Sequence, residues 1–205
     1  LISQKLSNEK SLISFYQEIK SDINSYVDEA KTHKELSLRD YLGKRYNKND
    51  EIVKWKDCSV EILKKQVLQI NQFFHEAINN NKKIILIGED IDDPYGGAFK
   101  VSKGLSRLSE DNVISTPISE SGIVGMGIGM SLLGYKPFIE IMFGDFISYS
   151  FDQILTNASK FFHMYNKQVA APITIRTPMG GGRGYGPTHS QSIEKIFNGL
   201  NNIKI

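Results

Sequence analysis

The chain has 205 residues, a formal net charge of +2, 40% hydrophobic residues and 23% charged residues. This is the composition of an ordinary globular protein, and its scattered lysines form no basic patch, so we expect no nucleic-acid partner. The single cysteine, Cys58, excludes an internal disulfide or a CxxC metal site and favours a reducing, cytoplasmic setting. No apolar run approaches the roughly 20 residues that cross a membrane, so we expect no membrane partner either.

The first 58 residues differ in pattern from the rest. Apolar side chains recur every three or four positions in residues 9–33, which predicts an amphipathic helix. Residues 34–58 lose this periodicity and predict a linker, with one short helical turn around residues 38–41 and Trp55 packed on a surface. The chain begins at Leu1 and stops at Ile205 within an alternating pattern, so we expect it to be a piece of a longer protein.

Residues 59–205 alternate between helical and strand patterns, which defines the expected domain. The predicted helices are residues 59–81 (capped by Ser59), 99–108, 119–133 and 151–165, and the predicted strands are residues 83–88, 113–115, 136–142 and 171–176. This alternation predicts a doubly wound α/β fold with a mostly parallel sheet flanked by helices, preceded by the N-terminal helical extension. Ligands of such folds bind at the carboxyl ends of the strands. Here those ends are residues 88–89, 116–120, 142–146 and 176–189.

The run of residues 113–146 carries the densest pattern. Ser119 is expected to be a helix N-cap, and Glu120 follows in the first turn, near the positive end of the helix dipole. The helix then contains glycines at positions 122, 125, 127 and 129. Each costs a helix roughly 0.5–1 kcal/mol relative to alanine. Close packing, a ligand or a partner chain must therefore compensate.

Two further segments at strand ends carry polar side chains. Four carboxylates, Glu89, Asp90, Asp92 and Asp93, raise the possibility of a divalent metal, but Pro94 interrupts them and no glycine stands at a calcium-loop position, which favours a solvated loop. The second segment, residues 176–191, is too rich in glycine for a regular element and is expected to be a long loop. That loop would deliver His189 and Gln191 above the sheet. The histidine is as readily structural as functional.

Four ordered motifs together resemble one family: TPISESG, GYKPFIEIMFGDF, FDQILTNASK and GGGRGYGPTHSQS. Over residues 60–200 the chain resembles the beta subunit of the thiamine-diphosphate-dependent decarboxylating component of 2-oxoacid dehydrogenase complexes, of the pyruvate, branched-chain or acetoin type. The resemblance implies that residues 59–205 are a pyrimidine-binding domain. It also implies that the parent enzyme oxidatively decarboxylates a 2-oxoacid and transfers the acyl group to a lipoyl group.

The resemblance also implies roles for particular side chains. Glu120 would bond the ring nitrogen of the cofactor's aminopyrimidine and share a proton with it, whereas alone it would be read as a helix-start carboxylate. Phe146 would stack on the pyrimidine ring, with Ile118 and Met142 lining the slot, although the last two are also ordinary candidates for core packing. His189 would assist the substrate or the incoming lipoyl group. Glu89 would be a second acid near the pocket.

Residues 14–32 resemble the closing helix of the family's alpha subunit, so we expect a parent that fuses alpha-like and beta-like halves. No GDG…N motif is present, which implies that a diphosphate-binding domain elsewhere holds magnesium and that this chain supplies no metal ligand. The expected partners are that alpha-like domain, the lipoyl domain of the acyltransferase and a second copy of the chain. Alone, the chain is expected to be inactive. The alternatives are a transketolase-like or synthase thiamine enzyme and a non-catalytic assembly module.

Overall fold

The computed structural model describes residues 8–33 and 65–205. The chain divides into two compact units, Leu1–Cys58 and Ser59–Ile205. The expected linker, the short turn at residues 38–41, the packing of Trp55 and the cap at Ser59 all lie outside the described residues.

The described residues of the first unit form the helix α1 (Glu9–Thr32), as the spacing of apolar residues predicts. Its N-terminus is capped by Asn8, whose Oδ1 accepts a hydrogen bond from the Ser11 backbone N–H at 2.8 Å. None of its residues is buried. Among the described residues of both units, no helix is long and apolar enough to cross a membrane.

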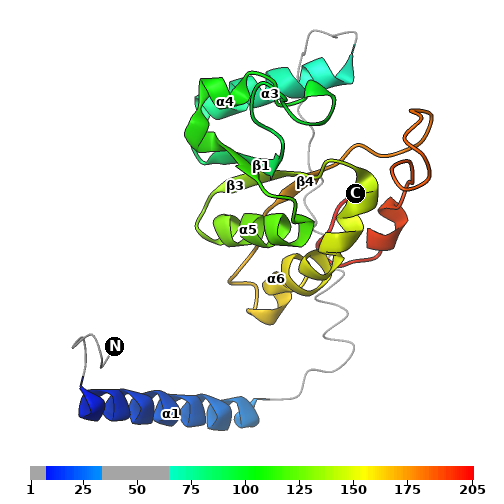
Figure 1. The fold of residues 1–205 in the computed structure, drawn as a ribbon. Coiled ribbons are helices and arrows are strands. Elements are labelled where there is room, and N and C mark those ends of the chain that lie inside the picture. Colours follow the sequence, from blue (N-terminus) through cyan, green and yellow to red (C-terminus); the bar gives the residue numbers. More distant parts are fainter. Residues whose placement is uncertain (1–7, 34–64) are drawn as a thin grey trace. The chain divides into compact units, whose positions relative to one another are not determined.

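The second unit is built on a four-stranded sheet in which all strands are parallel (Figure 1). Its strands are β1 (Ile84–Glu89), β2 (Val113–Thr116), β3 (Lys136–Glu140) and β4 (Thr174–Arg176), in the order β2-β1-β3-β4. Every residue of β1 is buried, because a continuous apolar run suits a central strand covered on both faces. The doubly wound α/β fold predicted from the sequence is thereby confirmed.

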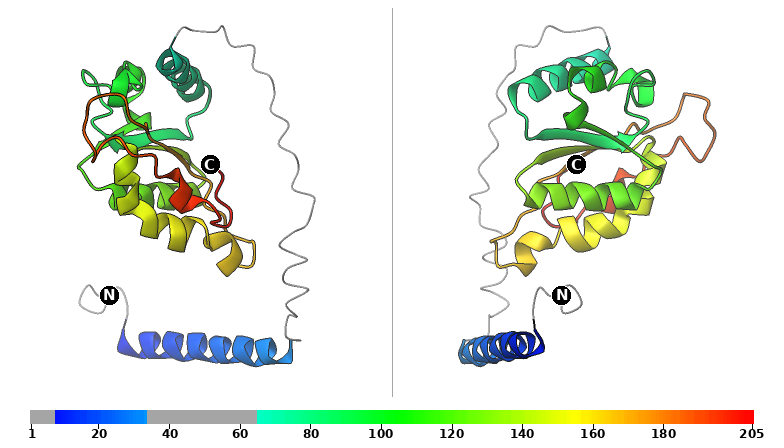
Figure 2. Two further views of the ribbon diagram at one scale, coloured as in Figure 1. Left: turned by 90° about the vertical axis from the view of Figure 1, so that its right-hand side faces the viewer. Right: turned by 60° about the vertical axis from the view of Figure 1, so that its left-hand side comes forward.

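Helices cover both faces of this sheet (Figure 2). On one face lie α3 (Gln66–Asn80) and α4 (Leu105–Leu108), and on the other lie α5 (Glu120–Leu132) and α6 (Phe161–Met164). Successive side chains of β1 point to opposite faces of the sheet and so belong to two separate hydrophobic clusters. Leu86 packs in the same cluster as Phe74 of α3, whereas Ile87 packs in the same cluster as Val124 of α5. The C-terminal segment joins the α5 side, where the rings of Phe197 and Phe151 lie 5.5 Å apart.

The predicted boundaries fail where the backbone adopts special conformations. Of the helix expected over residues 59–81, residues 59–64 lie outside the described part of the chain, and α3 covers Gln66–Asn80. The helix expected over residues 99–108 is wrong: a 3-10 turn at Ala98–Lys100 is followed by the four-residue α4. Phe99 and Gly104 have positive φ angles of 58° and 86°, which no right-handed helix accommodates. A second short 3-10 turn, Glu110–Asn112, leads into β2.

The segment after β3 also departs from the prediction. Instead of one helix over residues 151–165, the chain forms a 3-10 helix at Gly144–Ser150, a π-helix at Gln153–Ala158 and then α6. The flanking strands are shorter than expected, with β3 ending at Glu140 and β4 starting at Thr174. The glycine-rich loop is irregular as predicted, up to a final 3-10 helix at Glu194–Phe197.

Candidate functional site

The carboxyl ends of β1 and β2 bring two acids together. Glu89, the last residue of β1, pairs in register with Thr116, and Glu120 opens α5 just beyond β2. Both acids are buried, with exposed fractions of 6% and 8%. Burial raises the pKa of Glu89, and the neighbouring Glu120 raises it further, while the Ser119 backbone N–H lowers it by bonding the carboxylate. The arrangement therefore favours holding a proton on Glu89.

Two buried oxygen atoms at this position have no hydrogen-bond partner within the described part of the chain: Glu89 Oε1 and Thr116 Oγ1. Buried polar atoms are almost always satisfied in native proteins, so these two unpaired atoms at the ends of β1 and β2 are available to bond a ligand. Ser119 is the N-cap residue of α5, as predicted, although its side chain makes no capping bond. Its carbonyl accepts the first hydrogen bond of the helix, from the Ile123 N–H at 2.8 Å.

An aromatic cluster forms where β3 ends. The ring of His189 meets Phe143 and Phe146 edge-on, with centroids 4.9 Å and 5.0 Å apart. Tyr185 packs on Phe143 at 5.5 Å, and Thr188 Oγ1 lies 2.9 Å from His189 Nδ1. The glycine-rich loop thus brings His189 onto Phe146, a residue distant in the sequence. The structure places these two predicted site residues together.

The other two predicted pocket residues are less enclosed. Ile118 is 81% exposed, and Met142 is half-buried. The part of the chain that is described therefore does not close an apolar slot around them.

Asp145, directly before Phe146 in the chain, was not anticipated as a functional candidate. It is a buried acid that accepts a hydrogen bond from Gln191 Nε2 at 2.7 Å and one from the Gln191 backbone N–H at 3.4 Å. The only signal in the sequence is a carboxylate directly before Phe146.

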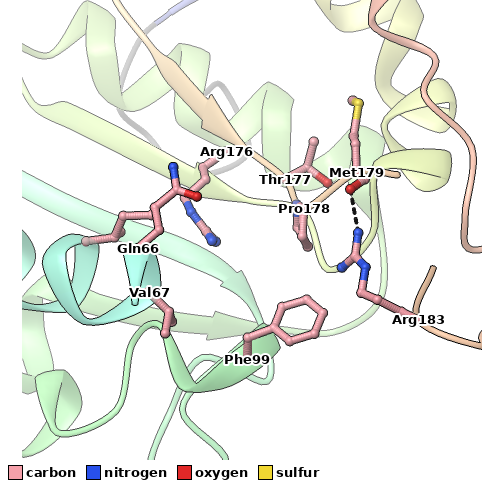
Figure 3. A pocket seen from close by; sticks show the side chains of 9 residues that line it. Gln66, Val67, Phe99, Arg176, Thr177, Pro178, Met179 and Arg183 are labelled. Atoms are coloured by element: carbon pink, nitrogen blue, oxygen red, sulfur yellow. Dashed lines mark hydrogen bonds between the residues drawn. The ribbon is translucent and has the colours of Figure 1, made fainter. Parts of the chain in front are cut away.

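A cleft of about 660 Å³ lies on the α3 side of β4 (Figure 3). Its lining consists of Gln66, Val67, Ile70, Phe99, Arg176, Thr177, Pro178, Met179 and Arg183, and includes none of the predicted site residues. Arg176 pairs with the buried Glu140, whose pKa burial raises to about 7 against the opposing effect of Arg176. The Arg183 guanidinium donates hydrogen bonds to the Met179 and Gly180 carbonyls. Its Cζ lies 5.0 Å from the centre of the Phe99 ring.

Within the described residues, no group of three potential metal ligands gathers at the carboxylate cluster after β1. The solvated-loop interpretation is nevertheless wrong for two of its members. Glu89 is buried, and the side chain of Asp93 is only 8% exposed. Asp93 accepts from the Gly104 N–H at 3.0 Å and from Ser106 Oγ at 3.1 Å, which keeps its pKa below the ordinary value. It anchors the loop.

A parallel sheet with helices on both faces and unsatisfied polar atoms at its carboxyl edge defines an α/β domain of the kind that binds ligands at its strand ends. Within that class the chain belongs to the transketolase pyrimidine-binding domain family, which it matches over residues 68–205. This confirms the resemblance seen in the motifs.

Curated relatives agree with the family. The chain is 37% identical over 132 residues to a pyruvate dehydrogenase E1 component subunit beta of Leifsonia xyli, covering 64% of this chain and 39% of the relative. It is 37% identical over 137 residues to the 2-oxoisovalerate dehydrogenase subunit beta of Bacillus subtilis, covering 66% and 42%. It is 34% identical over 147 residues to an acetoin:2,6-dichlorophenolindophenol oxidoreductase subunit beta of Cupriavidus necator, covering 67% and 44%. The chain thus spans about two fifths of their length.

Proposed function

We propose that residues 59–205 form the pyrimidine-binding half of a thiamine diphosphate site in a 2-oxoacid dehydrogenase first component. That enzyme oxidatively decarboxylates a 2-oxoacid and transfers the acyl group to a lipoyl group. The observation that carries the proposal is the buried Glu120 at the start of α5, beside a second buried acid, Glu89. It stands in a pyrimidine-binding domain whose relatives are dehydrogenase beta subunits.

The residues present fit the cofactor. An aminopyrimidine carries ring nitrogens and an amino group, and the strand ends offer two buried oxygens that lack partners, Glu89 Oε1 and Thr116 Oγ1. When bound, thiamine diphosphate supplies the electron sink for decarboxylation. The relevant chemistry of the chain is therefore proton placement at a buried carboxyl group.

Each predicted side chain has one task in this proposal. Glu120 holds and shares a proton with the pyrimidine ring, because a buried carboxyl can both donate and accept it. Phe146 offers a flat face to that ring, and Ile118 and Met142 line the slot once a partner closes it. His189 engages Thr188 through Nδ1, so we assign its Nε2 to the substrate or the lipoyl group.

The proposal extends to partners, since a pyrimidine domain supplies only half of such a site. The other half is a diphosphate-binding, alpha-like domain that also holds magnesium, and α1 is the closing helix of that domain in a fused parent. The remaining partners are the lipoyl domain of the acyltransferase and a second copy of the chain, in a cytoplasmic setting.

A Glu120→Gln substitution in the enzyme assembled with its diphosphate-binding partner tests the proposal. Positioned acid–base groups contribute typically 10²–10⁴-fold to a rate, so we expect decarboxylation of pyruvate and branched-chain 2-oxoacids to fall by at least about 10²-fold. Glu110→Gln, in an exposed acid of the turn before β2, is the control and should leave the rate unchanged. Unchanged decarboxylation by the Glu120→Gln enzyme would refute the assignment. Ketol transfer between sugar phosphates without lipoyl-dependent activity would favour the transketolase-like alternative.

A further inference from the structure

The bond between Asp145 and Gln191 joins two segments that are 46 residues apart in the sequence. Asp145 is 8% exposed, and an ionised carboxylate at such a position needs strong hydrogen bonds. Gln191 meets this need twice, through its side-chain amide at 2.7 Å and its backbone N–H at 3.4 Å. Hydrogen bonds to a charged acceptor are about twice as strong as bonds between neutral groups.

Each partner of this bond stands close in the chain to a proposed site residue. Asp145 immediately precedes Phe146 in the 3-10 helix at Gly144–Ser150, and Gln191 follows His189 by two positions. The ring of His189 lies edge-on to Phe146 at 5.0 Å. A shift of Gln191 away from Asp145 would therefore move His189 off the aromatic ring.

The loop that carries His189 depends on such a tie, because its own backbone is permissive. Gly180, Gly182, Gly184 and Gly186 all have positive φ angles, and glycine loses more conformational freedom on ordering than any other residue. Two backbone bonds hold the loop near its start, from the Gly144 N–H to Pro178 O and from the Gly180 N–H to Gln191 O. The second of them also involves Gln191, so the loop converges on that residue.

We propose that Asp145 and Gln191 form a positioning clamp that closes the glycine-rich loop and sets His189 against Phe146. The catalytic consequence of the clamp rests on the function proposed above, whereas the closure of the loop does not. Neither residue needs to touch the substrate. Their effect is exerted through the placement of His189.

The clamp is tested first on the loop itself, with the 205-residue chain. Gln191→Glu sets two carboxylates face to face and should open the loop. Asp145→Asn keeps an acceptor for Gln191, and the double variant Asp145→Asn/Gln191→Glu recreates the amide–carboxylate bond in reverse. Gln168→Glu, which adds the same charge at an exposed position before β4, is the control.

Trypsin cleavage after Arg183, followed by mass spectrometry, reports loop opening without any assay of activity. Gln191→Glu should be cleaved about tenfold faster than the unaltered chain, since a lost hydrogen bond to a charged group is worth roughly a factor of ten or more. Asp145→Asn, whose acceptor is neutral, should be cleaved at a rate between the two, while the double variant and the control should remain within about twofold of the unaltered chain. Unchanged cleavage of Gln191→Glu, or failure of the double variant to restore protection, would overturn the clamp.

The catalytic consequence is tested in the assembled enzyme. Because misplacement of a catalytic group by about 1 Å can cost up to roughly 10²-fold, Gln191→Glu should lower kcat about tenfold or more. In a His189→Ala background the same substitution should have no further effect, because the clamp acts through His189. Additive losses would overturn the proposed route. If His189→Ala alone leaves kcat unchanged, the catalytic consequence fails, and the cleavage result still decides the closure of the loop.

Discussion

Alanine at Gly127 and alanine at Gly129 should change the stability of the domain in opposite directions, although the two glycines stand two residues apart in α5. A Cβ at Gly127 would lie 2.4 Å from Ile139 Cδ1 and 2.9 Å from Ile139 Cγ1. Ile139 is a fully buried residue of β3, so it cannot swing into solvent. A Cβ at Gly129 would meet no heavy atom within 4 Å.

The two substitutions share one energy term and differ in another. Replacing a helical glycine by alanine stabilises by roughly 0.5–1 kcal/mol at either position. Forcing an extra methyl group into a packed core costs roughly 1–3 kcal/mol, and only Gly127 incurs it. The difference between the two variants therefore isolates the packing term, and Gly129→Ala should be the more stable by about 1–3 kcal/mol.

Urea unfolding of the 205-residue chain, followed by circular dichroism, measures this difference. In thermal unfolding it corresponds to a Tm gap of roughly 2–12 °C, since 1 kcal/mol shifts Tm by about 2–4 °C for 150–250 residues. Equal stability of the two variants, or a more stable Gly127→Ala, would show that α5 does not pack on β3 as described.

Three further expectations follow from the described contacts. Since burial raises the pKa of Glu140 from 4.5 to about 7, the native state binds its proton more tightly than the unfolded state, so stability falls as pH rises from about 4.5 to 7. In the Glu140→Gln variant, the urea midpoint should fall less steeply with pH across that range than in the unaltered chain. Asp93→Ala should cost about 1–3 kcal/mol in urea unfolding, because it leaves the Gly104 N–H and the Ser106 hydroxyl without their acceptor, whereas Ala at the exposed Asp111 should cost under about 0.5 kcal/mol. Calorimetry with the isolated chain should detect weak or no binding of thiamine diphosphate, and tight binding would contradict the two-domain site.

The sheet could be predicted from the sequence because its signals are local. A short, unbroken apolar run that is rich in isoleucine and bounded by turn residues favours a strand covered on both faces, and β1 is such a strand. The helix expected over residues 99–108 failed for a reason that no periodicity shows. Phe99 adopts a positive φ, and its ring then lines the cleft beside β4. Tertiary contacts overrode the helical pattern there.

The residues of the candidate site also differ in whether a local sequence signal or a long-range contact reveals them. Glu120 could be singled out because its position at the start of a helix after a strand is written in adjacent residues. Its neighbour Glu89 could be placed only at a strand end, and the raised pKa of Glu89, caused by burial and then by the nearby Glu120, depends on contacts made through strand pairing. The clamp between Asp145 and Gln191 joins residues 46 positions apart, and no local pattern reports such a pair.

Contacts within this chain account for some of the glycines of α5 but not for all of them. Packing accounts for Gly127, which lets the helix approach Ile139, but it does not account for Gly129, which meets nothing within 4 Å. A helix that is apolar on every side is ordinarily buried, yet Leu132 and Leu133 at the end of α5 are exposed, as is Ile118 before its start. The proposed diphosphate-binding partner accounts for all of these if it packs along α5. The helix would then carry its acid, Glu120, to the seam between the two halves of the site.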